Sequence, residues 1–275
     1  MNSKYPNIKQ SIFLILGITG IMIGLGIFLG ILAAALKLKI SNHPVIIGSI
    51  NLFAIGFFLL RAKSKTKCKY AEIYPIQPFD KQFLIPMVLI LLGLSVILSE
   101  MDNVLRIFLP MPDFLMKIFM GLTLKSENLF ESIFLLSIIA PVSEELLFRG
   151  LILQSFLNQY NVWKSVLVSS FLFALMHLNP WQFTSAFLLG IVFSFWFIKF
   201  KSLLPCLIGH SLFNSLPILL KYTNLNIAGY TTDPVTSTFQ PIWFDAVGFT
   251  LLGFGIYIFK KLSSGLNKPV FGNVE

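Results

Sequence analysis

Long apolar runs separated by short polar segments dominate this chain. The first run, Ser11 to Leu36, is longer than the roughly 7–15 apolar residues of a signal peptide and reaches the roughly 20 that cross a bilayer as a helix. It therefore predicts a first transmembrane helix that is retained. Later runs predict further membrane helices at Pro44–Leu60, Phe83–Ser99, Phe130–Tyr160, Trp163–Leu178, Phe183–Ile198, Leu203–Leu220 and Trp243–Leu262. The predicted fold class is all-α, a polytopic membrane helix bundle with about eight transmembrane helices.

Two longer connections interrupt this pattern. Glu100–Asn128 contains Val104–Met120, in which apolar residues mix with charges and prolines, so we interpret Val104–Met120 as a segment at the membrane interface. Lys221–Gln240 is rich in Thr, Asn, Gly and Pro and predicts an irregular loop. Pro141 is expected to kink the long fourth helix. Since neither a repeat nor a soluble domain is evident, residues 1–275 are expected to form a single integral membrane domain.

Composition supports the membrane assignment. Only 12% of the 275 residues are charged, against about a quarter in an ordinary soluble domain, and 56% are hydrophobic. The formal net charge of +9 does not indicate a nucleic-acid partner, because the basic residues fall between apolar runs and not along one polar face. We therefore expect the apolar helices to be surrounded by the lipid bilayer. Cys68 and Cys206 are too few for a disulfide framework and are expected to stay reduced.

The Lys and Arg residues between the apolar runs predict the orientation of the chain in the membrane, because these residues are retained on the cytoplasmic side. With the amino terminus inside, most of them are cytoplasmic: Lys4, Lys9, Arg61, Lys63, Lys65, Lys67, Lys69, Lys81, Lys164, Lys199, Lys201, Lys260, Lys261 and Lys268. Fewer fall outside: Lys37, Lys39, Arg106, Lys117, Lys125 and Lys221. Both termini are therefore expected in the cytoplasm. We expect a multi-pass integral protein of a bacterial cytoplasmic membrane.

Charged residues within an apolar helix are the first candidates for chemistry. A charge at the bilayer centre costs at least about 2.5–3.5 kcal/mol on insertion scales, so such groups usually face the protein interior and have a function there. Glu145 and Arg149 are spaced i,i+4 in the favourable order for a helical ion pair, and we assign this pair a structural, supporting role. Glu144 lies about 100° around the helix from Glu145 and is free to act on water or a metal. Glu144 is therefore the candidate catalytic carboxylate.

Two other apolar helices contribute imidazole and amide groups. His177 lies in one of them, and His210 and Asn214 lie at i,i+4 on one face of the other. Such a face could bind a metal, a carbonyl oxygen or a developing oxyanion. We expect Glu144 and His177 within direct or one-water hydrogen-bonding reach, with His210 and Asn214 lining the same cavity. Taken singly, each residue could instead be an interhelical hydrogen-bonding group.

Together these residues resemble the motifs of the CPBP family of intramembrane endopeptidases, also called the Abi or CAAX-protease-like family, which includes the type II CAAX prenyl endopeptidases. The family pattern is Glu-Glu-x-x-x-Arg, then Phe-x-x-x-His, then His-x-x-x-Asn, on separate helices. The resemblance covers residues 132–220, the motif-bearing catalytic core. The matching positions are Glu144, Glu145 and Arg149, then Phe173 and His177, then His210 and Asn214.

The resemblance implies a helical bundle that hydrolyses a peptide bond of a membrane-associated peptide or protein. In that function Glu144 activates water, His177 helps to hold it, and His210 and Asn214 stabilise the oxyanion. The cofactor is left open: Glu144, His177 and His210 could hold a catalytic zinc, yet the same groups can act without one. Since the chain has no His-Glu-x-x-His sequence, we favour a metal-independent mechanism. The substrates open to such a protein include prenylated proteins, bacteriocins and other peptides.

Two other functions fit part of the pattern. Intramembrane Glu and His also mark the ion pathway of a transporter or proton relay. That function predicts polar residues along a route across the membrane, whereas here they form one cluster. The second alternative is a non-catalytic immunity or binding protein of the same fold. The complete set of motif residues favours the enzyme.

Overall fold

A computed structural model describes residues 3–37, 44–112, 114–115, 129–223, 225–231 and 238–265. This part of the chain consists of helices and connecting segments and contains no strand. The short helices α3 (Tyr70–Ile73) and η1 (Lys81–Phe83) lie between α2 and α4. The long helices are α1 (Ile8–Ala35), α2 (Pro44–Thr66), α4 (Leu84–Phe108), α9 (Val162–Met176), α10 (Pro180–Phe200), α11 (Leu204–Leu220) and α12 (Ile242–Gly265).

One further helical stretch, from Leu129 to Leu157, changes its hydrogen-bonding pattern along its length. Its pieces follow one another without a break, and we call the whole stretch the glutamate helix because it carries Glu144 and Glu145. π-helical turns are rare and are frequently found at functional sites. The pieces are α6 (Leu129–Ser132), the π-helix η2 (Ile133–Ile139), α7 (Ala140–Glu145), the π-helix η3 (Leu146–Leu153) and α8 (Gln154–Leu157).

The predicted all-α class is confirmed, and each apolar run coincides with a helix of the structure. By length and composition, four stretches among the described residues could cross a membrane: Ile8–Ala35, Lys81–Phe108, Pro180–Phe200 and Ile242–Ser264. Two shorter helices, α9 and α11, are also apolar. These helices identify the chain as an integral membrane protein. The larger number of spans and the cytoplasmic location of both termini stay predictions.

The helix predicted at Phe83–Ser99 extends further along the chain. α4 continues to Phe108 and so includes the start of Val104–Met120, the segment interpreted as interfacial. Arg106 Nε donates to Asp102 Oδ2 at 2.7 Å, and this i,i+4 ion pair supports the last turns of α4. The helix then ends shortly before Pro110, because proline disfavours helical geometry in the residue that precedes it. Half of the remaining predicted segment, residue 113 and residues 116–120, lies outside the described residues.

Asparagine side chains fix the starts of α1 and α10. Asn7 Oδ1 accepts a hydrogen bond from the Gln10 N–H at 2.9 Å, and Gln10 Oε1 accepts one from the Asn7 N–H at 2.9 Å. This reciprocal capping box satisfies donors that would otherwise have no partner. Asn179 Oδ1 accepts from the Trp181 N–H at 3.1 Å. The second cap starts α10 directly after the turn that follows His177.

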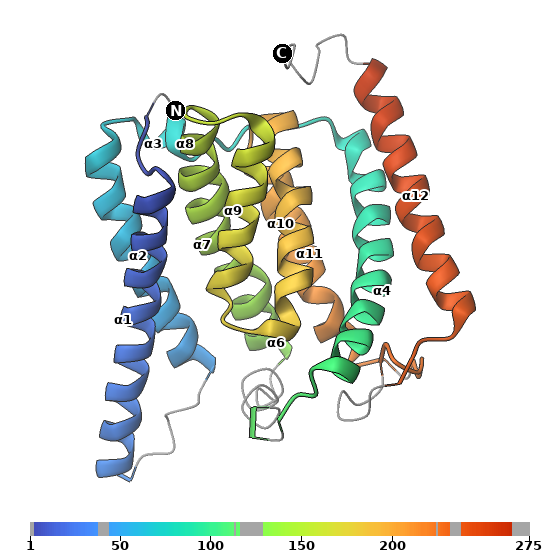
Figure 1. Cartoon of the computed structure of the whole chain (residues 1–275), viewed down its shortest axis with the longest axis horizontal. Coiled ribbons are helices and arrows are strands. Elements are labelled where there is room, and N and C mark those ends of the chain that lie inside the picture. The colour runs from blue at the N-terminus through green and yellow to red at the C-terminus, as the bar shows by residue number, and fades with distance from the viewer. Residues whose placement is uncertain are drawn as a thin grey trace.

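The glutamate helix lies, together with α9, α10 and α11, between two pairs of helices (Figure 1). α1 and α2 contact each other on one side, and α4 and α12 contact each other on the other side. α9, α10 and α11 also contact the glutamate helix. At the α4–α12 contact, a Cβ added to Gly93 would lie 2.6 Å from the Gly248 carbonyl oxygen, so only glycine allows this approach. The middle of the glutamate helix is therefore enclosed by other helices.

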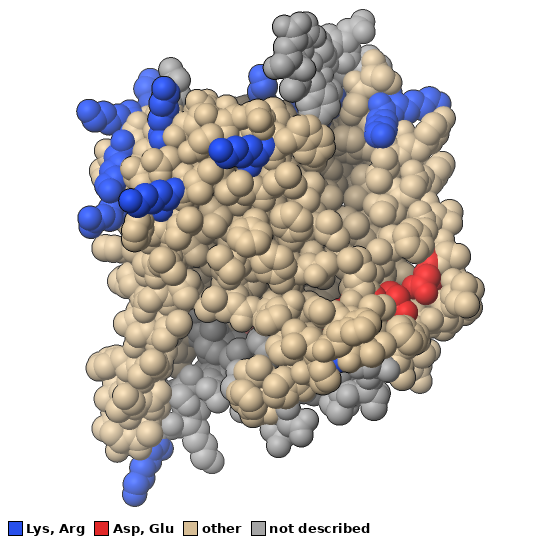
Figure 2. Space-filling view, viewed as in Figure 1, with Lys and Arg blue, Asp and Glu red and all other residues tan. Residues whose placement is uncertain are grey.

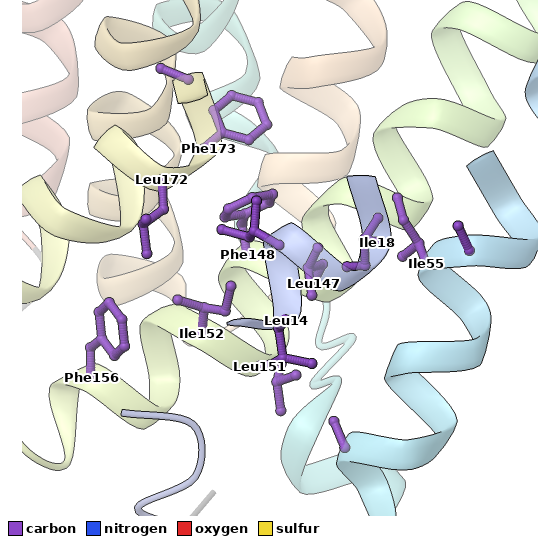
Figure 3. Close-up of a cluster of buried hydrophobic side chains, with 14 of the residues drawn as sticks. Leu14, Ile18, Ile55, Leu147, Phe148, Leu151, Ile152, Phe156, Leu172 and Phe173 are labelled. Carbon is purple, nitrogen blue, oxygen red and sulfur yellow. The ribbon is translucent and has the colours of Figure 1, made fainter. Parts of the chain in front are cut away.

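Buried apolar side chains pack on both sides of the glutamate helix. On one side, η3 packs against α1, α2 and α9, as Figure 3 shows for Leu147, Leu151, Ile18, Ile55 and Phe173. On the other side, Leu153 belongs to a cluster with side chains of α4, α10 and α11. Charged groups enclosed by such clusters are shielded from water and need internal partners.

Basic side chains gather at one end of the molecule (Figure 2). This end carries the start of α1 and the ends of α2, α10 and α12 in Figure 1. Lys9, Lys63, Lys199 and Lys260, which the orientation analysis places in the cytoplasm, belong to these segments. The distribution is the one expected if this end faces the cytoplasm.

Cysteine labelling tests this orientation. We would place Lys65→Cys or Tyr230→Cys in a chain that also carries Cys68→Ser and Cys206→Ala. An impermeant thiol reagent added to intact cells should label position 230, whereas position 65 should react only after lysis, because the positive-inside rule places it in the cytoplasm. Labelling of position 65 in intact cells would reverse the predicted orientation.

Candidate functional site

The candidate residues come from three helical stretches that meet inside the bundle. Glu144 and Glu145 end α7, and Arg149 lies in η3. His177 is the residue at which α9 ends, and α11 carries the remaining histidine and asparagine. The structure brings Glu145 and His210, which are 65 positions apart in the sequence, into direct contact.

The Glu145 carboxylate joins Arg149 and His210. Its Oε1 accepts from Arg149 Nη1 at 2.8 Å and lies 2.8 Å from His210 Nδ1. The residues are 0%, 1% and 5% exposed in that order. Because an ionised carboxylate only accepts hydrogen bonds, His210 carries its hydrogen on Nδ1 in this contact. His210 is therefore held by Nδ1 and presents Nε2 to other groups.

Arg149 is held on its other sides as well. Its Nη2 donates to the Gly190 carbonyl oxygen of α10 at 3.2 Å, and its guanidinium carbon lies 4.6 Å from the Phe173 ring centroid and 5.4 Å from that of Phe193. Cation–π contacts of this kind strengthen when water is excluded. A Cβ on Gly190 would lie 2.8 Å from the Ser170 Cβ, so glycine lets α10 approach α9 here. Arg149 thus connects Glu145 to α9 and α10.

Glu144 faces His210 without a direct hydrogen bond. Its Oε2 lies 3.8 Å from His210 Nε2, beyond the roughly 2.7–3.2 Å of a normal N–H···O bond. Glu144 is 9% exposed, and no hydrogen bond joins it to another described residue. Its carboxylate is therefore available to accept a hydrogen from water, whereas Oε1 of the adjacent Glu145 is already occupied.

His177 approaches the same site from the end of α9. Its Nδ1 lies 2.9 Å from the Phe173 carbonyl oxygen, which leaves Nε2 without this partner. The His177 ring packs edge-on to Phe173 with the centroids 5.0 Å apart, and the His210 ring packs on the same phenylalanine at 5.8 Å. The described residues contain no direct hydrogen bond between His177 and Glu144. The one-water separation stays a prediction.

Asn214 reaches the backbone of the glutamate helix. Its Nδ2 donates to the Leu136 carbonyl oxygen at 3.0 Å. Asn214 and His210 lie one turn apart on one face of α11. α11 is therefore attached to the glutamate helix twice, through His210 to Glu145 and through Asn214 to Leu136. The Asn214 amide retains a second N–H, because an amide nitrogen carries two.

Two histidines and a glutamate are the donor types of a catalytic zinc site, but the described structure does not bring three such side chains together. Such a metal takes about three protein ligands and leaves one position open. In the part of the chain that the structure describes, no group of three or more His, Cys, Asp or Glu residues is arranged to hold a metal ion. Glu144, His177 and His210 are therefore not assembled as a metal centre in the described structure.

Sequence reasoning missed several contacts of this site. It paired Glu145 with Arg149 alone, whereas Glu145 also contacts His210. Phe173 was only a motif position, yet its ring contacts Arg149 and both histidines of the site. The spacing Phe-x-x-x-His was the available signal for Phe173. The carbonyl of Leu136 left no signal, because every residue carries such an acceptor.

Comparison with known proteins finds a match to one family model in the middle of the chain. Residues 126–216 match the family model described as type II CAAX prenyl endopeptidase Rce1-like. This range contains all the candidate residues from Glu144 to Asn214 and overlaps residues 132–220. The predicted resemblance to CAAX-protease-like proteins is confirmed. Neither a curated protein nor a solved structure matches the chain.

Proposed function

We propose that this chain, whose residues 126–216 match the type II CAAX prenyl endopeptidase Rce1-like family, is an intramembrane endopeptidase. Its substrate is a membrane-associated peptide or protein. The observation that carries the proposal is the position of His210, which Glu145 holds through Nδ1 while Nε2 faces Glu144. Amide hydrolysis needs a base for the attacking water and a hydrogen-bond donor for the oxyanion. In this proposal Glu144 is the base and His210 is the donor.

In this proposal Glu144 takes a proton from a water molecule while the water oxygen attacks the carbonyl carbon of the scissile bond. The carbonyl oxygen becomes an oxyanion, to which His210 Nε2–H and the second N–H of Asn214 donate. The C–N bond then breaks, and the protonated Glu144 returns its proton to the leaving nitrogen. His177, whose Nε2 is not used by Phe173, helps to hold the water. The products are a carboxylic acid and an amine.

Charge balance supports a doubly protonated His210 in this mechanism. With His210 as imidazolium, the two carboxylates of Glu144 and Glu145 are balanced by two cations, Arg149 and His210. A neutral His210 would leave one net negative charge inside an apolar bundle, which is unfavourable without a partner. The imidazolium has a hydrogen on each nitrogen, so it can donate to Glu145 and to the oxyanion together. Glu145 thereby gains a positioning role beside its ion pair with Arg149.

The direct test uses purified protein in liposomes that contain EDTA. A farnesylated CAAX peptide and its unprenylated form are the first substrates, since the family name specifies a prenyl endopeptidase. We expect mass spectrometry to detect hydrolysis of at least one membrane-bound peptide, with one ¹⁸O incorporated from labelled water. We expect the rate to change less than about two-fold when EDTA is present, because no step uses a metal.

The proposal has two separate ways to fail in this experiment. The endopeptidase proposal is wrong if the folded protein cleaves neither of these peptides and if the membrane peptides of cells with the native protein equal those of cells with Glu144→Gln. Cleavage that EDTA stops and zinc restores would keep the activity and overturn the metal-independent mechanism.

A further inference from the structure

The helical pattern around Pro141 removes the two backbone donors that the Leu136 carbonyl oxygen would have in a regular α- or π-helix. In the π-helical turn before α7, the Ala140 N–H donates to the Leu135 carbonyl, five residues earlier. In the same register, the donor for Leu136 would be residue 141, but Pro141 has no N–H. The α-helical donor for Leu136 would be Ala140, whose N–H is already used. The change of helical pattern and the proline together leave the Leu136 carbonyl without either of these donors.

Asn214 supplies the missing donor. A carbonyl inside a membrane bundle must find a partner, because no water is present in the hydrocarbon to replace one. The Asn214 Nδ2 lies 3.0 Å from the Leu136 oxygen and donates to it. The neighbouring His210 is held to the same helix by Glu145. On this face of α11, the Glu145 side chain therefore positions His210, and the Leu136 backbone carbonyl positions Asn214.

We infer that Pro141 is a positioning residue for Asn214. By removing one backbone N–H, Pro141 keeps the Leu136 carbonyl available to the Asn214 amide, and that bond fixes the amide plane. The second amide N–H then has a defined direction for the substrate oxygen. Only this last step rests on the proposed function. An N–H at residue 141 would bond Leu136 in the backbone and release the Asn214 side chain to rotate.

A double-mutant cycle on thermal stability tests the coupling without any assay of activity. Asn214→Leu keeps the branched shape and removes the donor, so Leu136 is left unpaired and the thermal midpoint in detergent should fall by about 3 °C or more. Adding Pro141→Ala to this variant supplies a backbone N–H and should restore at least half of the loss. Pro141→Ala in the native background should give no comparable gain, because Asn214 already pairs the carbonyl.

The matched control is Pro86→Ala, at another buried proline within a helix, in α4. Its effect on the midpoint should be the same with Asn or Leu at position 214, because independent sites are additive. If Pro141→Ala changes the midpoint equally in both backgrounds, the inference is wrong. If Pro141→Ala does not accumulate in the membrane, Asn214→Asp is the second test of the inference. The carboxylate of this variant has no N–H to donate to the Leu136 carbonyl. A native midpoint and native turnover of Asn214→Asp would also overturn the inference.

Kinetics then separate positioning from general stability. If the protein is an endopeptidase, Pro141→Ala should lower kcat about ten-fold and leave KM within about two-fold, because an oxyanion contact acts mainly in the transition state. A rise in KM at constant kcat would contradict the positioning role. Coupled midpoints in a protein that cleaves no peptide would retain the Pro141–Asn214 link and reject only the proposed function.

Discussion

We expect Glu144→Gln to abolish peptide hydrolysis while the protein still inserts and folds. The amide keeps the size and shape of the carboxylate but cannot take a proton from water, so the base of the reaction is lost. General-base catalysis contributes about 10²–10⁴-fold to a rate, and we expect kcat to fall by at least that range. The free energy of unfolding should change little, because Glu144 makes no hydrogen bond to another described residue. Product formation in liposomes and the thermal midpoint in detergent measure the two quantities.

Glu72→Gln is the matched control for this substitution. Glu72 is exposed on the short helix α3, and the same change of charge there should leave turnover and stability at the native level. Native turnover in purified Glu144→Gln would remove Glu144 from the mechanism. A large fall in the thermal midpoint would instead indicate that Glu144 holds the bundle together.

The positions of the helices could be predicted because each one is an apolar run of adequate length. The start of α11 follows the polar pair Lys201 and Ser202, and its end coincides with the last apolar residue before Lys221. Such boundaries depend on local sequence and on the cost of placing charges in lipid. The interior pattern of the glutamate helix was not predictable in the same way. Only the kink expected at Pro141 pointed to the change between π and α turns.

The sequence alone proposes the residues of the candidate site, but it predicts only part of the contacts between them. Spacing within one helix shows that Glu145 can reach Arg149 and that His210 shares a face with Asn214. It does not show which face of α11 meets the glutamate helix, because packing between distant segments decides that. The contact from Glu145 to His210 therefore appears only in the folded structure.

This shared contact makes Arg149 the residue whose loss should cost most stability. Arg149→Ala removes one of the two side chains that contact the buried Glu145 carboxylate. Breaking a buried ion pair in this way costs about 3–5 kcal/mol. The truncation also removes the hydrogen bond to Gly190 and the contacts with Phe173 and Phe193. We expect a corresponding loss in the free energy of unfolding, measured by denaturant titration in detergent. Turnover should fall as well, because Glu145 would no longer hold His210 in place.

Arg106→Ala tests whether burial is the cause. Arg106 and Asp102 form an ion pair with the same i,i+4 spacing, but their side chains are 13% and 27% exposed, against 2% and 0% for Arg149 and Glu145. Partly solvated pairs contribute only about 0–1 kcal/mol, so Arg106→Ala should destabilise far less. Equal losses for the two variants would mean that the arginine side chain matters through packing and not through the buried charge. An unchanged unfolding free energy in Arg149→Ala would reject the supporting role assigned to the Glu145–Arg149 pair.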